Sequence, residues 1–138
     1  PLPFDFDFPR YCYRVILNEA LSFGVLGATG RGLTEMHGVD VTEIEIVTLS
    51  MAHSLASVGG LCIGTTQVVD HQRLSAAGYC YSASAPPFVS AAASASLRIL
   101  RSEPGLVSAL RKNAEFLYKA VSGIPGLKVR RPPTPPPI

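Results

Sequence analysis

The feature that most constrains this chain is a glycine-rich segment, residues 22–32, in which glycine stands at positions 24, 27, 30 and 32. Glycine adopts backbone conformations that other residues avoid, so this spacing predicts a tightly turned loop. The run Arg14-Val15-Ile16-Leu17 precedes it and contains the β-branched residues Val15 and Ile16, which predicts a short strand. The sequence therefore indicates a strand that leads into a glycine-rich loop.

This arrangement is also typical of dinucleotide-binding domains, in which small residues let backbone amides approach a pyrophosphate. The usual spacing places a glycine three residues after Gly30, but Leu33 stands there, and Gly38 soon interrupts the next segment. The spacing disfavours nucleotide binding. A small nucleotide-binding oxidoreductase that uses Gly27 to Gly32 remains an alternative, as does a truncated product without function.

Other apolar runs bounded by turn residues predict further strands and helices. Strands are expected at residues 45–49, 59–64 and 79–82, and their nearly continuous apolar character favours burial on both faces. Helices are expected at residues 65–74, from Pro86-Pro87 to residue 100, and from residue 102 to a stop at Gly123 and Pro125. The expected fold class is α/β, with a mostly parallel sheet flanked by helices.

The composition limits the size of the unit and its partners. The chain has 138 residues, 47% of them apolar, enough for one domain or a piece of one. A net charge of +2 gives no basic face for a phosphate backbone, so nucleic acid is not an expected partner. Cys12, Cys62 and Cys80 lack the paired spacing of zinc or redox sites, and we expect buried, reduced thiols.

The chain begins at Pro1, and its first residues hold neither a basic region nor a continuous apolar run, so no signal peptide is expected. The sequence is interpreted as a fragment. Its longest weakly polar stretch, residues 74–100, is interrupted by Pro86, Pro87 and Arg98, which predicts that no transmembrane helix is present.

The stretch NEALSFGVLGATGRG, residues 18–32, resembles a signature of the α-oxoamine synthases. These are fold-type I pyridoxal-phosphate (PLP) enzymes that join an amino acid to an acyl-CoA with loss of carbon dioxide. The resemblance extends over residues 13–127 and implies the later half of the large domain of such a transferase. Residues 1–12 form an unaligned segment, and residues 128–138 form a proline-rich tail.

Three positions depart from the pattern of the active members. The resemblance implies an aspartate where Asn18 stands, a histidine where Leu21 stands, and the cofactor lysine where His53 stands. Only a lysine amine forms the internal Schiff base, because an imidazole cannot make that imine. The lysines of the chain all lie beyond the matching motifs, at positions 112, 119 and 128. We therefore expect no catalytic residue in this chain, and His53 is interpreted as a filler of the vacated lysine position.

Within this family the chain resembles the lysine-lacking subunits of serine palmitoyltransferases. The resemblance implies a heterodimer with a lysine-bearing catalytic homologue, which holds PLP covalently and condenses L-serine with palmitoyl-CoA in sphingolipid synthesis. Ser82 and Ser84 are expected to contact the partner's PLP phosphate in trans, because the matching segment of homodimeric relatives crosses the interface; capping of the following helix is the alternative. The resemblance also implies the cytosolic face of the endoplasmic reticulum membrane, with membrane contact through other segments.

The remaining polar candidates carry no expected chemistry. His37 and His71 lack the spacing of a metal site and are interpreted as ordinary hydrogen-bonded histidines. Glu35 and Asp70 are single carboxylates and are expected to be capping or surface groups.

Overall fold

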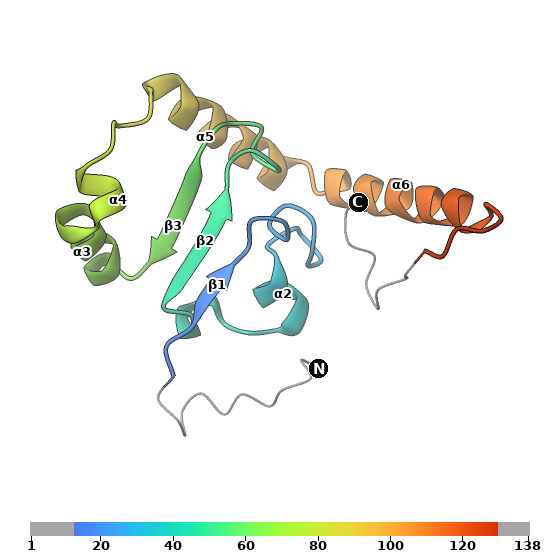
Figure 1. Ribbon diagram of the computed structural model, residues 1–138, viewed down its shortest axis with the longest axis horizontal. Helices are drawn as coiled ribbons and strands as arrows, with labels where there is room; N and C mark the ends of the chain where they lie inside the picture. The colour runs from blue at the N-terminus through green and yellow to red at the C-terminus, as the bar shows by residue number, and fades with distance from the viewer. Residues whose placement is uncertain (1–12, 130–138) are drawn as a thin grey trace.

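The computed structural model describes residues 13–129 and shows a small sheet with helices around it (Figure 1). The expected α/β class is confirmed. In chain order the elements are β1 (Ile16–Asn18), α2 (Leu33–His37), a 3₁₀ turn (Val41–Glu43), β2 (Ile46–Ser50), β3 (Gly60–Gly64), α3 (Thr66–Ser75), α4 (Ala77–Cys80), α5 (Pro87–Ser102) and α6 (Gly105–Ser122).

The sheet has the order β1-β2-β3 and is mixed. β1 and β2 are parallel, with Asn18 opposite Thr48, whereas β2 and β3 are antiparallel, with Ser50 opposite Gly60. The expectation of a mostly parallel sheet is therefore corrected to one parallel and one antiparallel pairing. Residues 51–59 are too few for the crossover that parallel neighbours need, so β2 and β3 form a hairpin.

The core lies mainly on β2 and the segments around it. Val47 and Leu49 are buried together with Ile44, and Leu17 of β1 packs against them. β1 and β3 are more exposed, because Ile16 is 69%, Leu61 is 40% and Ile63 is 46% exposed. The expectation that the strands are buried on both faces is thus wrong. Within residues 13–129, β1 and β3 lie at the two edges of the sheet, and β2 alternates buried and half-buried residues.

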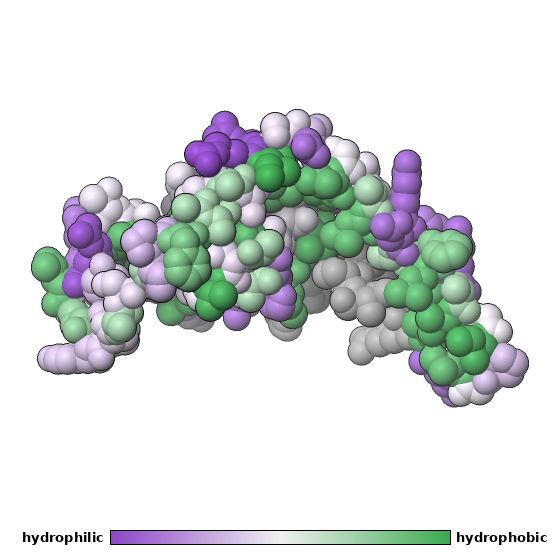
Figure 2. All heavy atoms as spheres, turned by 90° about the horizontal axis from the view of Figure 1, so that it is seen from above, coloured by the Kyte–Doolittle hydropathy of each residue, from purple (hydrophilic) through white to green (hydrophobic). Residues whose placement is uncertain are grey.

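The two long helices begin and end near the expected residues. Pro87 stands in the first turn of α5, where its missing N–H costs nothing, and Gly123 follows the end of α6. α5 buries Val89 and Ala93 against the β2–β3 hairpin. α6 buries Val107 near its start and then extends away from the sheet, and Figure 2 shows apolar side chains gathered over this projecting part.

The strand expected at residues 79–82 is absent. Residues 77–80 form the short helix α4, because the amides of Tyr79 and Cys80 bond to the carbonyl of Ala76 and Tyr81 bonds to Ala77. The backbone therefore has local partners. Among residues 13–129, the structure contains no helix with the length and hydropathy of a membrane span.

Candidate functional site

The candidate site lies where the parallel strands β1 and β2 end, since carboxyl ends of parallel strands meet at the same edge of a sheet. The glycine-rich loop follows β1, and the hairpin loop, residues 51–59, follows β2. The two loops touch: the Ser54 hydroxyl donates to the carbonyl of Phe23, and a Cβ on Gly24 would lie 2.4 Å from Ser54 Cβ. At this edge Asn18 ends β1, Leu21 directly precedes the glycine-rich loop, and His53 lies in the hairpin loop.

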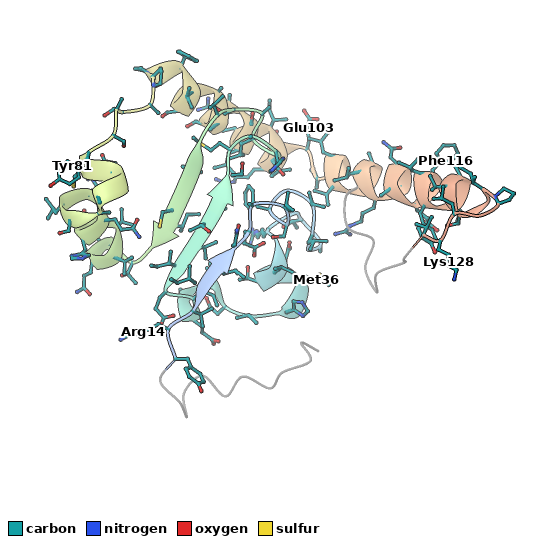
Figure 3. The ribbon with its side chains drawn as sticks, viewed as in Figure 1. Arg14, Met36, Tyr81, Glu103, Phe116 and Lys128 are labelled. Carbon is teal, nitrogen blue, oxygen red and sulfur yellow. The ribbon has the colours of Figure 1, made fainter. Side chains whose placement is uncertain are left out.

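None of these three side chains is a Schiff-base amine. Asn18 Oδ1 accepts a hydrogen bond of 2.9 Å from the amide of Ala20, Leu21 is 67% exposed, and His53 is exposed. Lys112 and Lys119 stand instead on α6, with the third lysine after it; Figure 3 shows Lys128 at the projecting end, away from this edge. The residues at the edge do not fit covalently bound PLP.

The hairpin loop is nonetheless held firmly. Leu55 is 2% exposed and packs with Met51 and the buried face of α5. The loop is closed by a bond of 2.9 Å from the amide of Met51 to the carbonyl of Gly59. The Ser57 hydroxyl donates to the carbonyl of Val89 at 2.8 Å, which ties the loop to the first turns of α5. His53 is thus presented from a fixed loop.

Two amides of the glycine-rich loop and the amide of Leu33, directly after it, are occupied by carboxylates of the same chain, while other loop amides bond to carbonyls of the loop. Glu35 accepts from the amides of Thr29 at 3.1 Å and Arg31 at 3.0 Å. Glu19 is 2% exposed and accepts from the amide of Leu33 at 2.8 Å and from the Ser22 hydroxyl. A pyrophosphate would have to displace these internal anions, so the geometry argues against the nucleotide-binding alternative.

The first turns of α6 fix the other side of this loop. Val107 is 1% exposed, and a Cβ on Gly30 would lie 2.9 Å from its Cγ2 atom. Arg111 of α6 donates to the carbonyl of Gly27. The loop is therefore packed between the hairpin loop and α6.

The serines expected to act in trans lie between α4 and α5, apart from β1 and on the β3 side of the sheet (Figure 1). Both are exposed, and the Ser82 hydroxyl donates to the carbonyl of Gly78 at 2.7 Å. The residue that caps α5 is Pro86, without a side-chain hydrogen bond. Neither Ser82 nor Ser84 caps α5, which disagrees with the capping alternative.

Other polar residues are distributed as follows. Asp70 is exposed and forms an ion pair with Arg73 at 4.0 Å. Glu35 accepts hydrogen bonds from the glycine-rich loop, as described above. Cys62 and Cys80 are free thiols but exposed, so the expected burial of these two is wrong, while Cys12 lies outside the described residues. Across residues 13–129, no group of three metal-ligating side chains gathers, His37 and His71 included.

Lowered carboxyl pKa values predict how stability depends on pH. The amide of Val15 bonds to Glu45 at 2.7 Å and holds its pKa below the ordinary 4.5. A folded-state pKa below the unfolded value gives stability that is present above pH 4.5 and is lost as the pH falls through the folded-state pKa. We expect the melting temperature to fall on acidification, and Glu45→Gln to reduce that dependence. Calorimetry between pH 7 and pH 3 tests this, with Glu43→Gln as the control; equal profiles for the two variants would contradict it.

Comparisons with known proteins agree with this geometry. The model of the family "Aminotransferase class I and II" matches residues 8–135. Long chain base biosynthesis protein 1c of Oryza sativa subsp. japonica is 49% identical over 87% of this chain, and long chain base biosynthesis protein 1 of Arabidopsis thaliana is 43% identical over 87%. Serine palmitoyltransferase 1 of Dictyostelium discoideum is 41% identical over 88%.

Solved structures give the same result. A serine palmitoyltransferase of Sphingomonas wittichii superimposes with a TM-score of 0.76 at 28% identity, over 86% of this chain and 29% of that one. The S. paucimobilis enzyme with a bound PLP-myriocin aldimine gives 0.75 at 30% identity, over 83% and 29%. The chain spans about a quarter of the curated relatives, with 25% of the two plant proteins and 26% of the Dictyostelium protein covered. It belongs to the aminotransferase class I and II family, and its relatives there include long chain base biosynthesis proteins and serine palmitoyltransferases.

Proposed function

We propose that this chain is part of a non-catalytic subunit of serine palmitoyltransferase, which supports the condensation of L-serine with palmitoyl-CoA to 3-ketosphinganine in sphingolipid synthesis. The observation that carries the proposal is the hairpin loop. Its fixed backbone presents His53 where the resemblance implies the cofactor lysine, and the lysines of the chain lie on or after α6. The names of the relatives support the same reaction.

The catalytic partner in this proposal is a lysine-bearing homologue that holds PLP covalently. Ser82 and Ser84 would contribute to its phosphate site from across the interface. Both serines are exposed, and the Ser82 hydroxyl would exchange its bond to the carbonyl of Gly78 for one to the phosphate. Pro86 and Pro87 have no N–H to offer, so the start of α5 would favour an anion through the helix dipole.

The proposed location is the cytosolic face of the endoplasmic reticulum membrane, with membrane contact through segments other than residues 13–129. This follows from the resemblance to serine palmitoyltransferase subunits. Fractionation of cells that express the full-length subunit with an epitope tag, followed by protease protection, would test the location and the side of the membrane.

The direct test of the non-catalytic role is a search for a Schiff base. Incubation with PLP, reduction by borohydride and mass mapping are expected to show no stoichiometric adduct, because residues 1–111 contain no lysine. Substoichiometric adducts on Lys112 or Lys119 would reflect ordinary surface amines. The His53→Lys variant is the matched comparison, since it restores an amine at the loop. A stoichiometric adduct on the unaltered chain that maps to residues 1–111 would contradict the proposal.

A further inference from the structure

Two carboxylates bond to the glycine-rich loop or to the residue that directly follows it. Glu35 of α2 accepts from Thr29 and Arg31, and Glu19 accepts from Ser22 and from Leu33, the first residue of α2. Glu35 receives both amide bonds described above and a bond of 2.8 Å from the Thr29 hydroxyl. A Cβ on Gly27 would lie 2.3 Å from its Oε2 atom, so the loop closes directly around the carboxylate. Burial disfavours the charge of Glu35, but the bonds from Arg31 and Thr29 outweigh it and lower its pKa.

Glu19 is the second and deeper carboxylate. Its backbone amide donates to the carbonyl of Thr48 at 2.7 Å, and its carbonyl accepts from Phe23 at 3.1 Å. Its side chain accepts from Leu33 and Ser22, and a Cβ on Gly32 would lie 2.3 Å from Oε2. Glu19 thus joins β2, the start of the loop and its end.

The glycine-rich loop also contacts the neighbouring hairpin loop and helps to hold it in place. The amide of Gly24 donates to the carbonyl of Gly30 at 2.7 Å, which closes the loop beside the residues that Glu35 holds. Gly24 lies against Ser54, and Ser54 bonds to Phe23. His53 is the neighbour of Ser54, so a contiguous set of contacts connects Glu35 with the candidate site.

We propose that Glu35 and Glu19 are positioning residues: they are the anions around which the glycine-rich loop folds, and through Ser54 they hold the hairpin loop that carries His53. In phosphate-binding loops the corresponding amides face a ligand from solution. Here the ligand is part of the chain. This inference does not depend on the proposed function, because it concerns the order of the two loops.

The test is Glu35→Ala in the 138-residue chain, followed by hydrogen exchange and by melting in sodium acetate or sodium chloride of equal ionic strength. We expect the amides of residues 29 and 31 to exchange about tenfold faster or more, the change that loss of a charged hydrogen bond produces. The amides of Met51 and Ser57, which bond within the hairpin loop, are also expected to exchange faster. Acetate should raise the melting temperature of Glu35→Ala above its value in chloride, because it supplies the missing carboxylate.

The control is Glu43→Ala, which removes the same charge from an exposed position on the 3₁₀ turn. It is expected to leave both loops protected and to show the same response to acetate as the wild type. Equal melting of Glu35→Ala in acetate and chloride would overturn the role of the carboxylate. Unchanged protection of residues 51 and 57 would overturn the positioning of the hairpin loop.

If Glu35→Ala does not fold, Glu35→Gln replaces it, since glutamine keeps the shape and one acceptor oxygen but removes the charge. Faster exchange at residues 29 and 31 in this variant is the expected result. Protection equal to the wild type would overturn the proposal, because a neutral acceptor would then suffice.

Discussion

Gly32→Ala is expected to lower the free energy of unfolding by about 3 kcal/mol or more, the combined scale of a glycine-only conformation and an overpacked buried site. Gly32 has φ +94° and ψ −154°, a region that side chains avoid. The new Cβ would lie 2.3 Å from Glu19 Oε2 and 2.6 Å from Cδ. Glu19 cannot move aside without losing its bond to the amide of Leu33, which would leave a buried carboxylate without that partner.

Gly38→Ala is the matched control for this change. Gly38 also has a positive φ, +68°, but a Cβ there would meet nothing within 4 Å. Gly38→Ala should therefore lower the free energy of unfolding by only about 1–2 kcal/mol, which is the cost of the left-handed conformation. Urea denaturation of the two variants beside the wild type gives the comparison. Equal midpoints for Gly32→Ala and Gly38→Ala would show that Glu19 does not fill the space beside Gly32.

Much of the fold could be predicted because the ends of its elements are set by local chemistry. The Thr65 side chain accepts from the amide of Val68 and starts α3, Pro87 lies in the first turn of α5, and Gly123 follows α6. Each signal lies within a few residues of the boundary that it sets. The strands β2 and β3 were likewise predicted from apolar runs bounded by glycine or polar residues.

The errors concern features that depend on neighbours in space. Tyr79 and Tyr81 favour a strand by propensity, yet a strand needs a partner, and the helical bonds to Ala76 and Ala77 satisfy this backbone instead. The exposure of β3 similarly depends on its place at the edge of the sheet. Its antiparallel direction, by contrast, could have been predicted from the short connection between β2 and β3.

In the candidate site, the sequence indicated which residues stand at the ends of β1 and β2 but not what the glycine-rich loop binds. The sequence predicts a capping or surface role for Glu35, and it gives Glu19 only as a member of the motif at residues 18–32. Their partners are backbone amides, whose directions depend on the positive φ angles of Gly24, Gly27 and Gly30. The glycines in the sequence indicate that such angles are allowed, but they do not indicate that the amides converge on a carboxylate.

The last prediction tests the proposed contribution of Ser82 and Ser84 to the partner's phosphate site. If both supply donors to a doubly charged phosphate, their loss should weaken cofactor retention tenfold or more, because hydrogen bonds to charged groups are worth about 1.5–3 kcal/mol each and about 1.4 kcal/mol is tenfold. Ser82→Ala with Ser84→Ala would be placed in the full-length subunit and co-expressed with the lysine-bearing homologue. PLP retention and turnover of serine with palmitoyl-CoA would be measured on the purified complex.

The matched control is Ser90→Ala with Ser94→Ala, which removes two exposed hydroxyls from α5 itself and leaves residues 81–86 unchanged. It is expected to retain PLP as the wild type does. Gel filtration establishes that both complexes assemble, so that a loss of cofactor reflects the phosphate site and not a loss of docking. Within the chain, the Ser82 hydroxyl already donates to Gly78, and it would have to exchange that bond for one to the phosphate. An assembled Ser82→Ala, Ser84→Ala complex with wild-type retention and turnover would show that the exchange does not occur, and would leave docking as the contribution of this segment.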